Sequence, residues 1–244
     1  MEKLAGKVAL VTGASGGIGG ALSRRLASMG VRVALGYARG REAAEKVAGE
    51  IRRGGGDAAA FGADLSQPDA AAAQVLEVRR HFGQVDILVA NAGVADRRQW
   101  QEVTAADFDR AMAVNLRAPF LAAQAALPAM IERKFGRVLF VSSVAAFTGG
   151  IVGPHYAASK AGLHAITAFL SRKVARDGVT VNAIAPALIA DTNMFAGQTS
   201  QLAGMVPVGR LGRSREVAAL SVAILENDYM TGQVVGIDGG MHPR

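Results

Sequence analysis

The sequence predicts an α/β fold with a mostly parallel sheet of seven strands and helices on both faces. Short apolar segments recur along the chain, helical patterns separate most of them, and no linker or low-complexity tract interrupts the alternation. A length of 244 residues suits one α/β domain, so we expect residues 1–244 to form a single domain.

The predicted strands are short, and most of their residues are apolar. Strands that are apolar on both faces are typical of a parallel sheet that is covered on both sides. They are expected at residues 7–11, 31–37, 57–63, 85–90, 136–142, 179–185 and 233–237.

Helical patterns fill the longer connections between these strands. They predict helices over Gly19–Met29, Arg41–Arg53, Pro68–Phe82, Ala106–Arg133 and His155–Arg176. Because such crossovers are right-handed, the expected topology is a doubly wound sheet of the Rossmann type. Ligands of these sheets bind at the carboxyl ends of the strands, so the loops that leave those ends should carry the chemistry.

The composition narrows the classes of function. No apolar run is long enough for a membrane helix, and the segment MEKLAGKVALVTG lacks the pattern of a signal peptide, so we expect a cytoplasmic protein without membrane contact. The chain has no cysteine, which excludes disulfides and thiol chemistry, and we expect no metal site. The formal net charge is +7, but the arginines are scattered in pairs without interleaved aromatic residues. This pattern favours an anionic cofactor or substrate over nucleic acid.

A glycine-rich segment, TGASGGIG, follows the first predicted strand and precedes a helix. Gly13, Gly17 and Gly19 permit a tight turn, close approach of the backbone to a pyrophosphate and close helix packing. The helix amino terminus favours negative charge. The segment predicts a nucleotide site, with a purely structural turn as the alternative.

Tyr156 and Lys160 lie four positions apart in a predicted helix, so their side chains face the same side. A nearby ammonium and a helix amino terminus should lower the pKa of the phenol from its usual value near 10. That change would bring the phenol toward the working range of a general acid and base. An isolated pair with this spacing is more often a surface feature, so the interpretation depends on the other motifs.

Five motifs in the same order and register resemble the short-chain dehydrogenase/reductase family. They are Thr12–Gly19, Asn91–Gly93, Asn115 within VNLRAPF, Ser142–Val144 and Tyr156–Lys160. The resemblance extends from residue 5 to the segment IDGG at residues 237–240. It implies an oxidoreductase that transfers a hydride between a nicotinamide cofactor and a carbonyl or secondary alcohol.

The resemblance also implies catalytic roles for four residues. Tyr156 would move the proton, and Ser143, favoured over Ser142 by its spacing from Tyr156, would hydrogen-bond the substrate oxygen. Lys160 would hold the nicotinamide ribose and tune Tyr156. Asn115 would anchor a water that links Lys160 to solvent.

The end of the second strand favours NADP over NAD. Tyr37 stands where family members that bind NAD carry an acidic residue, and Arg39 and Arg41 offer guanidinium groups to a 2′-phosphate. Gly16 occupies a position where members that prefer NADP often carry a basic residue, so NAD is the alternative. By resemblance, the cofactor-binding residues are Gly13, Ser15, Gly17, Ile18, Gly19, Arg39, Asp64, Leu65, Asn91, Ala92, Gly93, Tyr156, Lys160, Pro186, Ile189 and Thr192.

The chain departs from the family pattern after the sixth strand. Ala187 follows Pro186 where the family has glycine, and Thr192 arrives one residue late, after Asp191. The expected carboxamide contacts of Ile189 and Thr192 therefore depend on the local path of the chain. Residues 191–206 are expected to form a mobile flap over the substrate, with a plain surface loop as the alternative.

Within the family, the chain most resembles 3-oxoacyl-[acyl-carrier-protein] reductases of fatty acid biosynthesis. The resemblance implies reduction of a 3-oxoacyl thioester with NADPH; a CoA thioester, another small ketone or a secondary alcohol is the alternative. Those reductases carry basic residues that receive acyl carrier protein. Lys134 matches one such position, but Asp177 occupies another.

Three further expectations concern the class of protein, the place of two aromatic residues and the oligomeric state. A non-catalytic cofactor-binding regulator would not need the serine, tyrosine and lysine of the catalytic motifs. Trp100 and Phe147 either shape the substrate pocket or pack in the core. The resemblance also implies a homotetramer formed through the helices near 106–133 and 155–176 and through the last strand.

Overall fold

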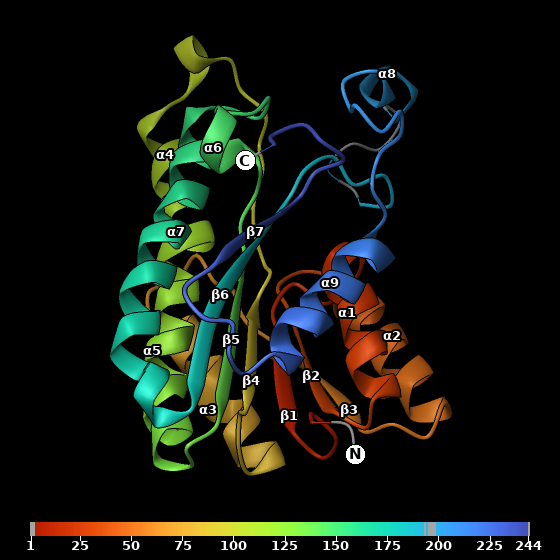
Figure 1. The fold of residues 1–244 in the computed structure, drawn as a ribbon, viewed down its shortest axis with the longest axis vertical. Coiled ribbons are helices and arrows are strands. Elements are labelled where there is room, and N and C mark those ends of the chain that lie inside the picture. Colours follow the sequence, from red (N-terminus) through yellow and green to blue (C-terminus); the bar gives the residue numbers. More distant parts are fainter. Residues whose placement is uncertain (1–2, 193, 195–198, 244) are drawn as a thin grey trace.

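A computed structural model describes residues 3–192, 194 and 199–243, and these residues contain one sheet of seven parallel strands (Figure 1). The strand order is β3-β2-β1-β4-β5-β6-β7. The order reverses between β1 and β4, and the carboxyl ends of neighbouring strands form a crevice at such a point. All seven predicted strands are confirmed. They are β1 (Val8–Val11), β2 (Arg32–Tyr37), β3 (Ala58–Gly62), β4 (Ile87–Ala90), β5 (Gly136–Val141), β6 (Val179–Pro186) and β7 (Val234–Ile237).

Helices cover both faces of the sheet (Figure 1). Side chains alternate along each strand, so Val8 and Leu10 enter one core while Ala9 and Val11 enter the other. The first core contains α3 (Ala70–Phe82), α5 (Ala118–Glu132) and α7 (Pro154–Val174), and the second contains α1 (Gly17–Ser28), α2 (Arg41–Arg53) and α9 (Ser214–Glu226).

None of the described helices is both long and apolar enough to span a membrane.

The predicted helix over Ala106–Arg133 is interrupted. It consists of α4 (Ala105–Met112), a π-helical turn at Ala113–Arg117 and α5. Such turns insert a residue into the helical repeat and are frequent at functional sites, and this one contains Asn115. Three α-helices of the described residues have no counterpart in the prediction: α9, α6 (Ala145–Thr148) and α8 (Thr199–Ala203).

The predicted flap falls partly on residues 193 and 195–198, which lie outside the described residues. Its base is fixed, because Ile189 pairs with Gly212 in an isolated parallel bridge. The apolar residues of this region form a cluster of their own, which we call the flap cluster: Leu188, Leu202, Val206 and Leu211.

Candidate active site

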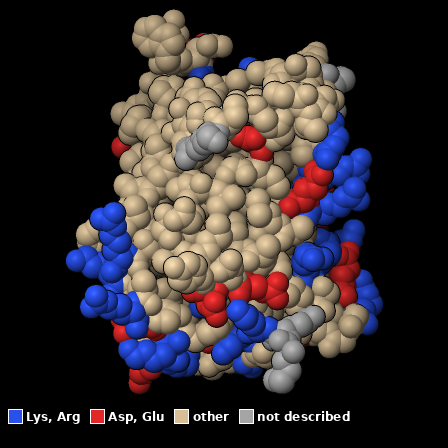
Figure 2. Space-filling model, in the orientation of Figure 1, with Lys and Arg blue, Asp and Glu red and all other residues tan. Residues whose placement is uncertain are grey.

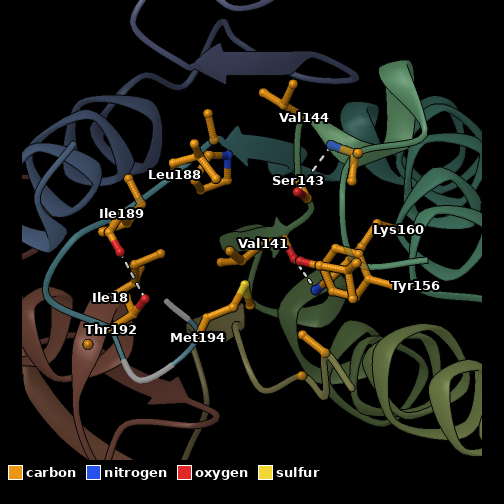
Figure 3. Close-up of a pocket in the computed structure, with 18 of the residues that line it drawn as sticks. Ile18, Val141, Ser143, Val144, Tyr156, Lys160, Leu188, Ile189, Thr192 and Met194 are labelled. Atoms are coloured by element: carbon orange, nitrogen blue, oxygen red, sulfur yellow. Dashed lines mark hydrogen bonds between the residues drawn. The ribbon is translucent and has the colours of Figure 1, made fainter. Parts of the chain in front are cut away.

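A cleft of about 750 Å³ opens at the carboxyl ends of the strands. Figure 3 shows Ser143, Tyr156 and Lys160 on one side of the cleft and Ile189 and Thr192 on the other. Eleven of the predicted site residues line it: Ser15, Gly17, Ile18, Asn91, Gly93, Ser143, Tyr156, Lys160, Pro186, Ile189 and Thr192. Seven do not: Gly13, Gly19, Arg39, Asp64, Leu65, Ala92 and Asn115.

The glycine-rich segment is packed too tightly for side chains at two positions. A Cβ on Gly13 would lie 2.9 Å from the Ala92 Cα, and one on Gly19 would lie 2.4 Å from the Gly13 carbonyl oxygen. These two glycines therefore allow the loop to pack closely against its neighbours on the side away from the cleft. Helix α1 then begins at Gly17, with no side chain capping its amino terminus. Uncapped N–H groups at a helix start suit a pyrophosphate, so this loop fits the nucleotide that the sequence predicts.

Asn91 ties the glycine-rich segment to the end of β4. Its side-chain amide donates to the carbonyl oxygens of Thr12 and Gly13, at 2.9 and 3.1 Å. In return, the Thr12 hydroxyl accepts hydrogen bonds from the backbone N–H groups of Asn91 and Ala92, both at 3.0 Å. These contacts hold the two central strands in register at the mouth of the cleft.

Lys160 is buried and aims its ammonium at the backbone. Its Nζ donates a 2.7 Å hydrogen bond to the Val141 carbonyl oxygen. Gly93 borders this group, since a Cβ there would lie at an ordinary contact distance of 3.4 Å from the lysine Nζ. Burial lowers the pKa of Lys160 to about 8.

The expected lowering of the Tyr156 pKa is wrong. Burial raises the pKa of the Tyr156 phenol, and a hydrogen bond with Ser143 only partly opposes that rise. The Lys160 ammonium lies 5.9 Å from the centroid of the Tyr156 ring and is bonded to Val141, so burial outweighs its influence. The phenol therefore stays protonated at neutral pH, which is the form that can donate a proton.

The two neighbouring serines have different surroundings. The Ser142 hydroxyl donates to the Lys160 carbonyl oxygen at 3.0 Å and lies 2.8 Å from His164 Nε2, so it contacts α7. The Ser143 hydroxyl accepts from the Ala145 N–H at 3.2 Å and lies beside Tyr156 in the cleft (Figure 3). This arrangement supports the prediction that Ser143 is the serine that contacts substrate.

Asn115 lies behind the cleft wall, completely buried. Its Oδ1 accepts from the Val94 N–H at 2.8 Å, and its Nδ2 donates to the Val94 carbonyl and to the Ser159 hydroxyl, both at 3.0 Å. A Cβ on Gly93 would lie 3.2 Å from Asn115 Oδ1. Asn115 therefore fixes the backbone that surrounds the Lys160 ammonium.

The residues expected near the adenosine and 2′-phosphate end of the cofactor lie partly in solvent. Arg39 and Asp64 are exposed, whereas Leu65 is buried in the core. Hydrogen bonds from the N–H and the hydroxyl of Ser66 lower the pKa of the Asp64 carboxyl, and the positive charge of Arg39 contributes.

The extra residue after β6 has a structural role. Asp191 turns away from the cleft, where its Oδ1 accepts hydrogen bonds from the N–H and the hydroxyl of Ser214 at the start of α9. Thr192 then lies in the cleft wall, and its hydroxyl donates to the Ile189 carbonyl at 3.0 Å. A Cβ on Gly17 would lie 3.3 Å from the Thr192 Cγ2, so this threonine faces the glycine-rich segment.

The sequence did not identify the apolar half of the cleft. The residues of this half come from the loops after β5 and β6, from the flap region and from the chain end. In the sequence, only the methionines of residues 191–206 hinted at an apolar site. They include Val144, Ala145, Ile151, Val152, Leu188, Met194, Met205 and Met241.

Trp100 and Phe147 do not line the cleft. Trp100 is 72% exposed, so it does not pack in the core either. Phe147, on α6, stacks against His242.

Lys134 and Asp177 form an ion pair with each other. They directly precede β5 and β6, at the amino ends of the strands. Both therefore lie at the opposite edge of the sheet from the cleft of the same chain.

Comparison with known proteins shows similarity over nearly the whole chain. The model of the short chain dehydrogenase family matches residues 7–203. The 3-oxoacyl-[acyl-carrier-protein] reductase FabG of Staphylococcus aureus is 36% identical over 242 residues, which is 97% of this chain and 98% of that protein. Versicolorin reductase 1 of Aspergillus parasiticus is 36% identical over 260 residues, with 98% and 97% covered. Among solved structures, a blue fluorescent protein from a metagenomic library in complex with NADPH has a TM-score of 0.92 and 35% identity, with 98% of this chain and 99% of that chain covered.

Proposed function

This chain belongs to the short-chain dehydrogenase family, and we propose that it is an NADPH-dependent reductase of 3-oxoacyl thioesters. One observation carries the proposal: Ser143, Tyr156 and Lys160 lie in one cleft, beside the uncapped start of α1. A regulator that only binds the cofactor would need the glycine-rich segment alone. The joint presence of the three polar side chains favours an enzyme.

The residues of the cleft divide the chemistry among them. NADPH, when bound, supplies the hydride. We assign its pyrophosphate to the backbone at Gly17 and Ile18 and its nicotinamide ribose to Lys160. Tyr156 donates its proton to the substrate oxygen, since its raised pKa keeps the phenol protonated. Ser143 hydrogen-bonds the same oxygen and stabilises the charge that develops there.

The choice of NADPH rests on charge at the end of β2. Arg39 is exposed beside the predicted adenosine end, and Tyr37 leaves that position without a repelling carboxylate. The similar metagenomic protein was solved with NADPH. Both observations support NADPH over NADH.

The substrate is proposed from the similarity to the 3-oxoacyl-[acyl-carrier-protein] reductase. A second candidate is another small ketone or a secondary alcohol, because versicolorin reductase 1, which is not named for a thioester, is similar to the same degree. Lys134 is paired with Asp177, so docking of acyl carrier protein at this position would have to compete with an internal ion pair. A CoA thioester avoids that requirement.

The experiment that tests the proposal is the initial rate of NADPH oxidation, compared with NADH, with acetoacetyl-CoA as the substrate. Rapid, NADPH-selective reduction supports it. If NADPH binds and acetoacetyl-CoA is not reduced, the thioester assignment is wrong. The same assay with other small ketones, and the reverse assay with NADP and secondary alcohols, then tests the second candidate.

We also propose a cytoplasmic homotetramer. The edge strand β7 leaves one row of backbone groups without a partner strand among the described residues. Figure 2 shows mostly uncharged side chains in the middle of the face that includes it, with charged side chains gathered along the lower part and the sides. Phe169 on α7 is 62% exposed. Light scattering at micromolar concentration should give a mass of about 100 kDa, four times the chain mass of 25.1 kDa. A mass of one chain would contradict the tetramer.

A further inference from the structure

The end of the chain, residues 238–243, returns from β7 to the apolar half of the cleft. Met241 lies in the cleft wall, although it is far from Tyr156 in the sequence. Met241 also packs against the flap cluster. In Figure 1 the C-terminus lies next to α6, which follows the end of β5. We call residues 238–243 the C-terminal tail.

Asp238 builds the turn that brings the tail back. Its carboxylate accepts hydrogen bonds from the N–H groups of Gly240 and His242, at 2.9 and 3.0 Å. Gly239 and Gly240 have φ values of +63° and +89°, which glycine adopts most readily. The Gly239 carbonyl also accepts from the Val208 N–H at 3.1 Å, so the turn is attached to the flap region.

A row of three rings in contact, one pair stacked and the other tilted, connects the tail to the catalytic wall. His242 stacks on Phe147, with ring centroids 5.1 Å apart and planes 10° from parallel. The Phe147 centroid lies 4.6 Å from that of His164, whose Nε2 is 2.8 Å from the Ser142 hydroxyl. The tail is therefore in contact, through these side chains, with the segment that carries Ser143.

We propose that Met241 sets the length of the apolar substituent that the cleft accepts. The inference rests on the proposed function, since it concerns the substrate of the same cleft. Ile151, Val152 and Leu188 line the apolar half, and the only charged side chain among the described lining residues is Lys160. These walls suit an uncharged alkyl chain, and the thioether of Met241 adapts to its end.

The proposal predicts a break in the dependence of affinity on chain length. Affinity should rise by about fourfold for each methylene that is buried, until the chain reaches Met241. Beyond that length, added methylenes stay in water or collide with the tail, so affinity should level off or fall. We call the length at which the rise stops the break point.

The test uses the full chain with NADPH and a series of saturated acyl N-acetylcysteamine thioesters of increasing length. These ligands lack the 3-oxo group, so isothermal titration calorimetry measures their binding without turnover. Met241→Ala should move the break point to chains longer by about two to three methylenes, the length of the side chain removed. Met241→Phe should move it to shorter chains. Tyr229→Ala, at a side chain that is 96% exposed, is the control and should leave it unchanged.

A second pair of variants tests how the tail is held. His242→Ala removes the stack on Phe147 and should make the break point less sharp, whereas His242→Phe keeps a ring there and should preserve it. Identical break points in wild type and both Met241 variants would overturn the inference, and so would undetectable binding at every length. Reduction of the 3-oxo analogues, measured in parallel, separates the two proposals: a shifted break point without reduction contradicts only the proposed function, and reduction with an unshifted break point contradicts only the role of Met241.

Discussion

Asn115 holds the backbone of Val94 on both of its polar groups, accepting from the N–H at 2.8 Å and donating to the carbonyl at 3.0 Å. A completely buried side chain thus fixes the segment that follows Gly93, next to the Lys160 ammonium. The contact between Asn115 and the Val94 backbone therefore supports both the active-site wall and the stability of the fold.

Asn115→Ala should therefore lower both stability and turnover. The substitution removes the side-chain partner of the half-buried N–H and carbonyl of Val94, which costs about 1–3 kcal/mol of unfolding free energy. Urea denaturation measures this loss. Asn182→Ala is a matched control, because Asn182 also bonds backbone groups on two sides, at Met230 and Gln233, but lies away from the cleft. It should lose stability and keep its kcat. Equal kcat losses in the two variants would contradict a specific role for Asn115 in the wall.

The lowered pKa of Lys160 predicts a stability that rises with pH. Its pKa is about 8 in the folded protein and 10.5 in the unfolded chain, so the unfolded state binds more protons between these values. The unfolding free energy of wild type, relative to Lys160→Met, should therefore increase by about 2 to 3 kcal/mol from pH 7.5 to 10. The raised pKa of Tyr156 lowers stability as the phenol of the unfolded chain titrates near pH 10, but Tyr156 is present in both proteins, so this contribution cancels in the difference. Lys173→Met, at an exposed lysine of the same helix, should show no such increase. If the difference in unfolding free energy between wild type and Lys160→Met does not change with pH, Lys160 is not desolvated.

Arg39→Ala should weaken NADPH by about 10- to 100-fold and leave NADH nearly unchanged, because only NADPH carries the 2′-phosphate that the guanidinium would bind. Fluorescence titration of both cofactors measures the two dissociation constants. Arg53→Ala, at the far end of α2, controls for the loss of one positive charge. Equal losses for both cofactors in Arg39→Ala would show that Arg39 does not contact the phosphate.

The sequence predicted the parts of the site that depend on local spacing. The four-residue interval between Tyr156 and Lys160 fixed their common face, because both lie on α7. The apolar strands predicted the sheet, and the parallel sheet predicted the edge at which the cleft opens.

Local sequence patterns do not predict contacts between distant parts of the chain. The π-helical turn around Asn115 breaks a continuous helical pattern, and helix α9 is capped by Asp191 from a distant loop. The direction of the Tyr156 pKa shift depends on burial, which spacing alone does not report. The return of Met241 to the cleft depends on a turn made by glycines near the chain end.

The central claim is that Tyr156 donates the proton in a reaction whose cofactor is held mainly by other residues. The most direct measurement is the steady-state kcat of Tyr156→Phe with NADPH and the best substrate of wild type, together with the dissociation constant of NADPH. We expect kcat to fall by at least about 100-fold and the dissociation constant to stay nearly unchanged, since the phenylalanine ring fills the same space but has no hydroxyl proton to donate. A variant that retains the wild-type kcat would show that Tyr156 is not the proton donor.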